Sequence, residues 1–328
     1  MQKPKVVITN KPCRETLAYL EPYCDVIAND EIQTWSRHKI IEKLQNATAM
    51  MAFMPDAVDE AFLESCPSLK MISCALKGYD NFDLQACNKR NVVITFVSDL
   101  LTIPTAELAV GLTIALARNF RAGDYHVRKG GHKGWRAHLY GQGLRNSVVG
   151  ILGFGAVGRA TALRLSGFGC KILYFDSSPD SSNDEQCATA SSTTLDHLLE
   201  LSDFILICLP LNEETRGMID SGRIRQMKSG AFLVNVSRGS VVDEKAVADA
   251  LEEGRLAGYA ADVFALEDLA LSNRPTDIDS RLLLPDASTV FTPHLGSAVT
   301  SVRKDIELQA AKHIVQFLQG EVPSGVIL

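Results

Sequence analysis

The stretch GFGAVG, residues 153–158, carries three glycines in the order G-x-G-x-x-G: Gly153, Gly155 and Gly158. It follows the strand pattern VVGIL and opens the helical pattern AVGRATALRLSGFG. In that setting the first glycine permits a tight turn, the second lets the backbone approach a pyrophosphate, and the third lets helix and strand pack closely. The helix N-terminus, which begins at Ala156 and Val157, offers unpaired N–H groups to phosphate oxygens. Alone, the same pattern also occurs at ordinary strand-to-helix turns.

A second strand pattern, KILYF, ends at Asp176, about twenty residues beyond the glycines, where a carboxylate accepts hydrogen bonds from ribose hydroxyls. A carboxylate there repels a 2′-phosphate, which favours NAD over NADP. A strand-end aspartate is also a common turn former. Strand, glycines, helix and acid together predict a Rossmann domain that binds NAD as cofactor.

Working outward, short strand patterns alternate with helical patterns along the whole chain. The strand patterns are VVIT (6–9), AMMAF (49–53), MISCAL (71–76) and VVITF (92–96), and then VVGILG, KILYF, DFILICL, AFLVNV, YAADVF and TVFTPH (289–294). Such alternation is typical of parallel sheets covered by helices on both faces. The two series therefore predict an α/β protein with two doubly wound units.

Three further segments complete the organisation. Residues 102–120 form a dense apolar pattern that predicts a helix bridging the two units. Residues 122–146 mix glycine, charge and aromatic residues without a clean period, which predicts a long loop. The tail after residue 295 is again helical, and we expect it to return to the first unit.

Composition limits the partners. The 328 residues carry a net charge of −6, which argues against a nucleic-acid or anionic-membrane surface. The N-terminal MQKPKVVITN has no signal-peptide form and the chain has no run long enough to span a bilayer, so we expect a cytoplasmic protein. The eight cysteines form no CxxC pair, which favours buried free thiols over disulfides or a metal site.

Titratable residues follow three strand patterns of the second series, at the edge where doubly wound sheets bind ligands. These are Arg238 in LVNVSRGSVVDE, Asp262 and Glu267 in GYAADVFALED, and His294 in FTPHLGSA. Each residue also has an ordinary explanation. Arg238 could pair with Asp243 or Glu244, Glu267 could be a solvated loop acid, and His294 a satisfied structural histidine.

Together these segments resemble the D-isomer-specific 2-hydroxyacid dehydrogenase family over essentially the whole chain. The resemblance rests on DNFD (80–83), the glycine pattern, LPLNEETRGMI (209–219), SRGSVVDE, DVF and TPHLGS. It implies that Arg238 clamps an anionic substrate, that His294 is the general acid/base, and that Glu267 orients the imidazole and raises its basicity. It also implies that Asp262, Pro210 and Thr105 belong to the cofactor site.

The resemblance further implies an architecture. Residues 1–100 and 296–328 are expected to form a flavodoxin-like substrate-binding domain, and residues 101–295 an NAD-binding Rossmann domain inserted into it. Members are usually homodimers through the NAD domains, using the helix and loop after residue 102, so we expect a homodimer.

Lys77, in the stretch CALKGYDNFD (74–83), bears on the substrate. One Arg fork satisfies a single carboxylate, so a second cation at a strand end suggests a substrate with more than one negative charge. The alternative is that Lys77 extends its ammonium into water. MMAFMPD, CALKGYDNFD, FVSDLLTIPTAELA and FTPHLGSAV resemble one branch of the family, the phosphite (phosphonate) dehydrogenases.

Within that branch the resemblance implies that phosphite is oxidised to phosphate by hydride transfer from phosphorus to NAD, with water as nucleophile. The implied substrate-binding residues are Met54, Lys77, Gly78, Arg238 and Ser297. Leu269 stands where the branch has tryptophan, which puts the fine selectivity of the site in doubt.

Two other functions are compatible with much of the sequence. A D-2-hydroxyacid dehydrogenase or glyoxylate/hydroxypyruvate reductase would share Arg238, Glu267, His294 and the cofactor site, so that only Lys77 and its neighbours separate the two enzymes. A non-catalytic NAD-sensing binder, as in the C-terminal-binding corepressors, is the other class. The charge balance gives this second class no support.

Overall fold

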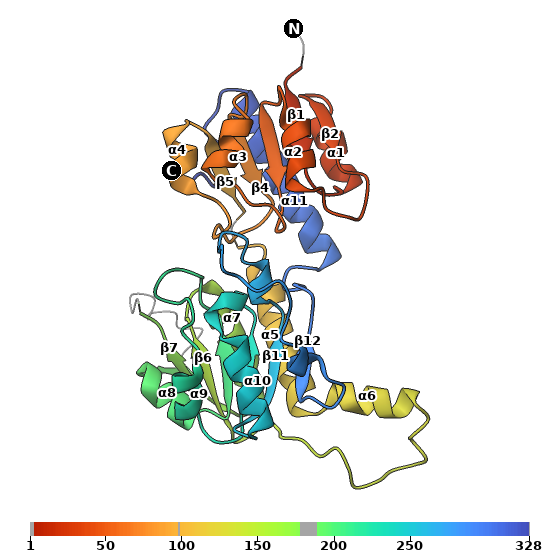
Figure 1. Cartoon of the computed structure of the whole chain (residues 1–328), viewed down its shortest axis with the longest axis vertical. Helices are drawn as coiled ribbons and strands as arrows, with labels where there is room; N and C mark the ends of the chain where they lie inside the picture. The colour runs from red at the N-terminus through yellow and green to blue at the C-terminus, as the bar shows by residue number, and fades with distance from the viewer. Residues whose placement is uncertain (1–2, 98, 178–188, 328) are drawn as a thin grey trace. The chain divides into compact units, whose positions relative to one another are not determined.

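Residues 3–97, 99–177 and 189–327 are described by the computed structural model, and they divide into two units (Figure 1). Unit 1 comprises Met1–Leu101, Leu269–Ser272 and Ala298–Leu328. Unit 2 comprises Thr102–Asp268 and Asn273–Ser297. The chain therefore builds most of unit 2 after leaving unit 1, contributes residues 269–272 to unit 1, and returns to unit 1 for its last helix.

Unit 1 is built on five parallel strands in the order β2-β1-β3-β4-β5, which is the flavodoxin-like order. The strands are β1 (Lys5–Ile8), β2 (Asp25–Ala28), β3 (Ala49–Ala52), β4 (Met71–Cys74) and β5 (Val93–Phe96). The helices are α1 (Arg14–Leu20), α2 (Arg37–Leu44), α3 (Glu60–Ser65), α4 (Leu84–Lys89) and α11 (Thr300–Leu318).

The apolar side chains of these strands alternate between two cores because successive strand residues face opposite sides of a sheet. Val7 packs with α2, α3 and α4 in one core, whereas Val6 and Ile8 pack with α1 and α11 in the other. The C-terminal helix α11 is thus part of the core of unit 1, where Ile306 and Ile314 are fully buried.

Unit 2 is built on seven parallel strands in the order β12-β11-β10-β9-β6-β7-β8. The strands are β6 (Val148–Leu152), β7 (Lys171–Phe175), β8 (Ala190–Ser192), β9 (Phe204–Ile207), β10 (Ala231–Asn235), β11 (Leu256–Ala261) and β12 (Thr289–Phe291). The helices are α5 (Thr102–Ala117), α6 (Phe120–Arg128), α7 (Ala156–Leu165), α8 (Leu195–Leu201), α9 (Ser221–Gln226) and α10 (Glu244–Glu252). The strand order reverses between β6 and β9, which is where a doubly wound sheet opens a ligand crevice.

Helices cover both faces of this sheet. Helices α8, α9 and α10 share one core with β9, β10 and β11, and α5 and α7 share the other with β6 and β10. Single-turn 3-10 helices lie in the connections: η1 (Ser166–Phe168), η4 (Gly239–Val241), η5 (Ala265–Glu267) and η6 (Ser280–Leu283). Both sheets confirm the predicted fold class of two doubly wound parallel-sheet units.

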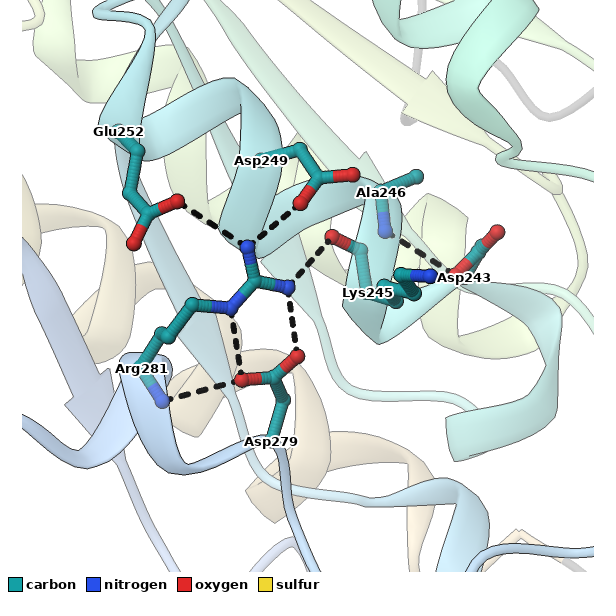
Figure 2. Close-up of polar contacts among 7 residues, drawn as sticks. All are labelled: Asp243, Lys245, Ala246, Asp249, Glu252, Asp279 and Arg281. Atoms are coloured by element: carbon teal, nitrogen blue, oxygen red, sulfur yellow. Dashed lines mark hydrogen bonds and ion pairs between the residues drawn. The ribbon is translucent and has the colours of Figure 1, made fainter.

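An ionic network ties α10 to the η6 segment of the same unit (Figure 2). The Arg281 guanidinium contacts carboxylates on both sides, namely Asp279 at 2.7 Å on its own segment and Asp249 and Glu252 on α10. These hydrogen bonds raise the pKa of Arg281 further above its usual range, and they lower the pKa of Asp279. The network links α10 to the segment that precedes β12.

The structure corrects the expected long loop over residues 122–146. Residues up to Arg128 belong to α6, a nine-residue helix with no buried residue. Strands β2 and β8 were also missed, because β8 reads ASS and β2 begins with an exposed aspartate. Among the described residues, none of the helices has the length and apolar character needed to cross a membrane, and the expected cytoplasmic location stays a prediction.

Candidate active site

The glycine loop joins β6 to α7, and its three glycines differ in what surrounds them. Gly153 has φ +88°, and a Cβ there would lie 2.7 Å from the Cys208 carbonyl oxygen. A Cβ at Gly158 would lie 2.1 Å from the Gly153 carbonyl oxygen, which shows how closely helix and loop pack. A Cβ at Gly155 would meet nothing within 4 Å. The second glycine therefore keeps an open backbone face, as close approach of a phosphate requires.

Two further features sit around this open face. Gly155 is the N-cap of α7, so the helix begins at Ala156 and Val157 with no side chain capping it. The Asp176 carboxylate, at the end of β7, accepts a hydrogen bond of 2.6 Å from the Phe154 N–H. The loop thus brings helix N–H groups and a carboxylate together, and these residues fit the pyrophosphate and ribose of a dinucleotide.

Pro210 and Thr105 lie in different parts of unit 2. Pro210 is exposed in the connection after β9, and its carbonyl accepts a hydrogen bond of 2.6 Å from the Thr215 hydroxyl. Thr105 lies in α5, and a Cβ placed on Gly296 would be 3.1 Å from its hydroxyl and 3.2 Å from Asp262 Oδ2. Thr105 therefore lies beside the turn that follows β12. Pro210 follows β9, the strand that pairs with β6, which leads into the glycine loop.

Asp262, directly after β11, holds that turn in shape. One of its oxygens accepts hydrogen bonds from the Thr292 hydroxyl and the Leu295 N–H, and the other from the Gly296 N–H at 2.8 Å. The side chain is 1% exposed, and burial raises the pKa of Asp262 against the lowering effect of these donors. Asp262, which the sequence predicts in the cofactor site, thus fixes the backbone of residues 292–296 through these hydrogen bonds.

His294 sits in the middle of the anchored turn in a strained backbone conformation. Its φ is +57°, in the left-handed region that residues other than glycine seldom adopt. The His294 N–H donates to the Asp262 carbonyl at 2.8 Å, which closes the turn from the main-chain side. Strain of this kind persists only where surrounding bonds over-determine it, and it concentrates at functional sites.

The imidazole of His294 meets Glu267 from the neighbouring η5 turn. His294 Nδ1 lies 2.6 Å from Glu267 Oε2, and the other carboxylate oxygen accepts from the Phe264 N–H at 2.8 Å. Both side chains are partly exposed, at 24% and 30%. With Nδ1 engaged by the carboxylate, Nε2 is the nitrogen left for proton transfer.

Arg238 follows β10, next to β11 in the same sheet, so its turn lies at the same edge as Glu267. Its backbone carbonyl accepts from the Asn235 amide at 2.9 Å, and its guanidinium donates to the Ser237 carbonyl at 2.8 Å. Ser297, half-buried, ends the His294 turn. Arg238, Glu267, Asp262, His294 and Thr105 are all members of unit 2.

The remaining predicted residues belong to unit 1. Lys77 and Gly78 follow β4 and Met54 follows β3, so all three lie at the carboxyl edge of its sheet, where each is half-buried. Lys77 forms no ion pair with any described residue of this unit. Leu269, also half-buried, belongs to the short segment 269–272 of unit 1.

Sequence reasoning missed Asp56, which shapes the turn that carries Met54. Asp56 is 6% exposed, and its carboxylate accepts from the Thr9 hydroxyl at 2.5 Å and from the Phe53 N–H at 2.7 Å. Burial raises the pKa of Asp56 to about 6. The aspartate stands in the quoted stretch MMAFMPD, but no local pattern marks an acid as buried.

Comparison with known proteins identifies the relatives of this chain. Residues 110–296 match the model of the D-isomer specific 2-hydroxyacid dehydrogenase NAD binding domain. Glyoxylate reductases of Thermofilum pendens and Thermococcus litoralis are each 34% identical over 100% and 99% of this chain and 95% and 97% of their own lengths.

Solved structures extend the similarity to the whole fold. A glyoxylate reductase from Paecilomyes thermophila has a TM-score of 0.82 at 25% identity, with 98% of each chain covered. The TT0316 protein from Thermus thermophilus has a TM-score of 0.87 at 27% identity, covering 99% of this chain and 100% of its own.

Proposed function

The chain belongs to the D-isomer specific 2-hydroxyacid dehydrogenase family of NAD-dependent oxidoreductases, and we propose that it interconverts a small 2-oxo acid, such as glyoxylate, and its 2-hydroxy acid. The observation that carries the proposal is the His294–Glu267 hydrogen bond of 2.6 Å at the carboxyl edge of an NAD-binding sheet. The curated relatives named glyoxylate reductase support the organic acid as substrate. Unit 2 is then the NAD-binding domain and unit 1 the substrate-binding domain.

In this proposal the cofactor is held by the glycine loop, Asp176, Pro210, Thr105 and Asp262. Bound NAD supplies the hydride acceptor for oxidation, and NADH the donor for reduction. The open face at Gly155 and the N-terminus of α7 bind the pyrophosphate, and Asp176 binds the ribose. The position of Asp262 under the His294 turn would align the cofactor end of the site with the proton-transfer group.

His294 handles the proton of the reaction. In reduction its Nε2–H donates to the carbonyl oxygen of the 2-oxo acid, and in oxidation Nε2 takes the proton of the hydroxyl group. Glu267 keeps the tautomer by accepting from Nδ1–H and favours the charged ring. Arg238 binds the carboxylate of the acid through its planar fork.

A second candidate, phosphite oxidation, is favoured by Lys77 at the end of β4. Phosphite is small and doubly charged near neutral pH, so two cations suit it better than one. Phosphite and water would give phosphate as NAD is reduced, with His294 taking the proton of the water. The resemblance of CALKGYDNFD and MMAFMPD to the phosphite-oxidising branch supports this candidate, whereas the names of the curated relatives favour glyoxylate.

A substrate panel followed by absorbance of NADH separates the two candidates. The purified chain is assayed with NAD and phosphite, with NAD and D-2-hydroxy acids, and with NADH and glyoxylate or hydroxypyruvate. Turnover of glyoxylate or a D-2-hydroxy acid without phosphite oxidation establishes the first candidate. Phosphite turnover far above the organic acids, with no reversal by phosphate, overturns it in favour of the second.

We further propose a homodimer formed through unit 2. Support comes from α6, which exposes Phe120, Tyr125 and Val127 at 57% each and buries no residue. A short helix with no buried face gains little stability by itself, and exposed apolar side chains of this size are candidates for an interface.

A further inference from the structure

The turn that carries Arg238 and the turn that carries Glu267 touch backbone to backbone. A Cβ on Gly239 would lie 1.8 Å from the Phe264 carbonyl carbon and 1.9 Å from the Ala265 nitrogen. Strands β10 and β11 are parallel neighbours, so the two turns leave the sheet side by side. Only glycine fits at this contact, because any side chain would push the turns apart.

Two buried carboxylates cross this contact in opposite directions. Glu244, in the first turn of α10, accepts from the Ala265 N–H at 2.8 Å through Oε1. Asp268, at the end of η5, accepts from the Ser240 N–H at 2.8 Å through Oδ2. The two residues are 8% and 2% exposed. Asp268 thus binds the main chain beside Arg238, and Glu244, from the helix that follows the Arg238 turn, binds the main chain of η5; we name this arrangement the carboxylate clamp.

Glu267 lies between the two points at which the clamp grips η5. The Ala265 N–H is held by Glu244 and the Asp268 side chain is held by Ser240, so both ends of the single turn are fixed. The Glu267 N–H donates to the Phe264 carbonyl at 2.9 Å inside the same turn. The orientation of the Glu267 carboxylate toward His294 therefore depends on the hydrogen bonds that Glu244 and the Ser240 N–H make with η5.

Burying the Glu244 carboxylate beside other acids carries an electrostatic cost. Burial raises the pKa of Glu244 to about 6, and the charges of Asp268, Glu267 and Asp279 add to the effect, while the Ala265 N–H opposes it. The charge of Glu244 in turn contributes to raising the pKa of the buried Tyr259 hydroxyl. The hydrogen bond from the Ala265 N–H offsets part of this cost.

We propose that Glu244 and Asp268 are positioning residues that lock the Arg238 turn to the Glu267 turn, so that the substrate-binding cation and the carboxylate partner of His294 keep a fixed relation. The roles given to Arg238, Glu267 and His294 rest on the proposed function. The lock itself is a property of the fold and is testable without substrate.

The test compares Glu244→Ala with Glu244→Gln, which retains an acceptor oxygen for the Ala265 N–H. Asp268→Ala breaks the reciprocal bond and carries the test if E244A does not fold. Asp59→Ala is the matched control, because it also removes a carboxylate that accepts a helix N-terminal N–H, that of Phe62 at 2.8 Å, but it lies in unit 1. NADH binding and thermal midpoints show that each variant is folded.

The readout is the pH titration midpoint of the His294 ring Cε1–H signal by NMR, assigned with His294→Asn. Because a well-placed carboxylate favours the protonated ring, E244A is expected to lower the midpoint by about 0.5 pH unit or more, while E244Q and D59A stay near wild type. Equal shifts in E244A and E244Q would reduce the role of Glu244 to charge alone, and no shift in E244A or D268A would reduce the clamp to structure. Either result overturns the proposal.

Kinetics add an independent arm once a substrate is found. E244A is expected to lose about tenfold to hundredfold in kcat/KM, with E244Q restoring most of it. If wild type turns over no member of the substrate panel, the proposed function fails while the titration still decides the clamp. An active wild type with an unmoved titration leaves the function standing and removes the clamp.

Discussion

At the scale of single residues, Lys77 separates the two candidate substrates. Lys77→Met removes the ammonium at the carboxyl end of β4, and Lys70→Met, just before the amino end of the same strand, is the matched control. If the substrate is a dianion, K77M loses a charged hydrogen bond of about 1.5–3 kcal/mol, which is roughly a tenfold to hundredfold rise in KM for phosphite. Steady-state kinetics on both variants make the measurement, and an unchanged KM would leave Lys77 a solvated lysine.

Alanine at Gly155 and alanine at Gly158, both in the cofactor loop, are expected to have different effects, the first on NADH binding and the second on stability. Gly155→Ala places a methyl in open space, so stability is kept while NADH affinity falls about tenfold or more, because the methyl occupies the phosphate approach. Gly158→Ala forces a methyl against the Gly153 carbonyl at 2.1 Å and is expected to cost about 1–3 kcal/mol of stability.

Thermal midpoints and NADH fluorescence titration separate these outcomes. Gly167→Ala, another position with nothing within 4 Å, is the control that should change neither quantity. A G155A variant that binds NADH as wild type does would contradict the placement of the pyrophosphate at this face.

At the scale of elements, α11 carries a buried histidine that makes the stability of unit 1 depend on pH. His313 is fully buried, its Nδ1 lies 3.2 Å from the Thr95 hydroxyl, and burial lowers its pKa below the usual 6.5. The unfolded chain therefore binds a proton at His313 more readily than the folded chain does. Its contribution to stability is complete above about pH 6.5 and is lost as the pH falls, with a slope of at most about 1.4 kcal/mol per pH unit.

Urea unfolding at pH 7.5 and 5.5 measures this slope in unit 1 when Trp135 is replaced by Phe, since the chain has two tryptophans and Trp35 lies in unit 1. His313→Gln should lose less stability at pH 5.5 than the parent does, whereas His38→Gln, on the exposed side of α2, should match the parent. The raised pKa of Asp56 acts in the opposite direction but is common to all variants. Parallel losses in H313Q and the parent would contradict the prediction.

Elements also show where sequence patterns succeed. Strands buried on both faces, such as β3 with AMMA and β9 with FILI, appear in the sequence as apolar runs. The order of strand, glycines and helix predicts the Rossmann connection. Edge strand β8 and the unburied helix α6 carry no such signal, because their positions depend on neighbours rather than on their own side chains. The order of segments predicts that Glu267 and His294 share a sheet edge, since their strands are neighbours.

The supports beneath the candidate site were harder to predict. Asp262, Glu244 and Asp268 bind backbone N–H groups up to 34 residues away in the chain, and no periodicity encodes such bonds. The left-handed backbone of His294 is likewise visible only in three dimensions, since nothing in TPHLGS requires it. Motif order thus predicts which residues meet, and tertiary structure decides how they are held.

At the scale of the whole molecule, the exposed side of α6 predicts self-association. Phe120, Tyr125 and Val127 lie on a helix that touches its own chain through Arg121, whose guanidinium donates to the carbonyls of Leu284 and Pro285. A helix anchored by polar contacts with its apolar side chains in water gains most by burying them against a second copy.

Light scattering after size exclusion should therefore give twice the chain mass of 35.7 kDa. The double substitution Phe120→Glu and Val127→Glu is expected to give the monomer mass, because burying two carboxylates at an apolar interface costs several kcal/mol. Ile32→Glu changes an even more exposed apolar residue of unit 1, at 90%, and should leave the dimer intact. A wild-type chain that elutes as a monomer at micromolar concentration would show that α6 is stable without a partner and would remove the homodimer from the proposal.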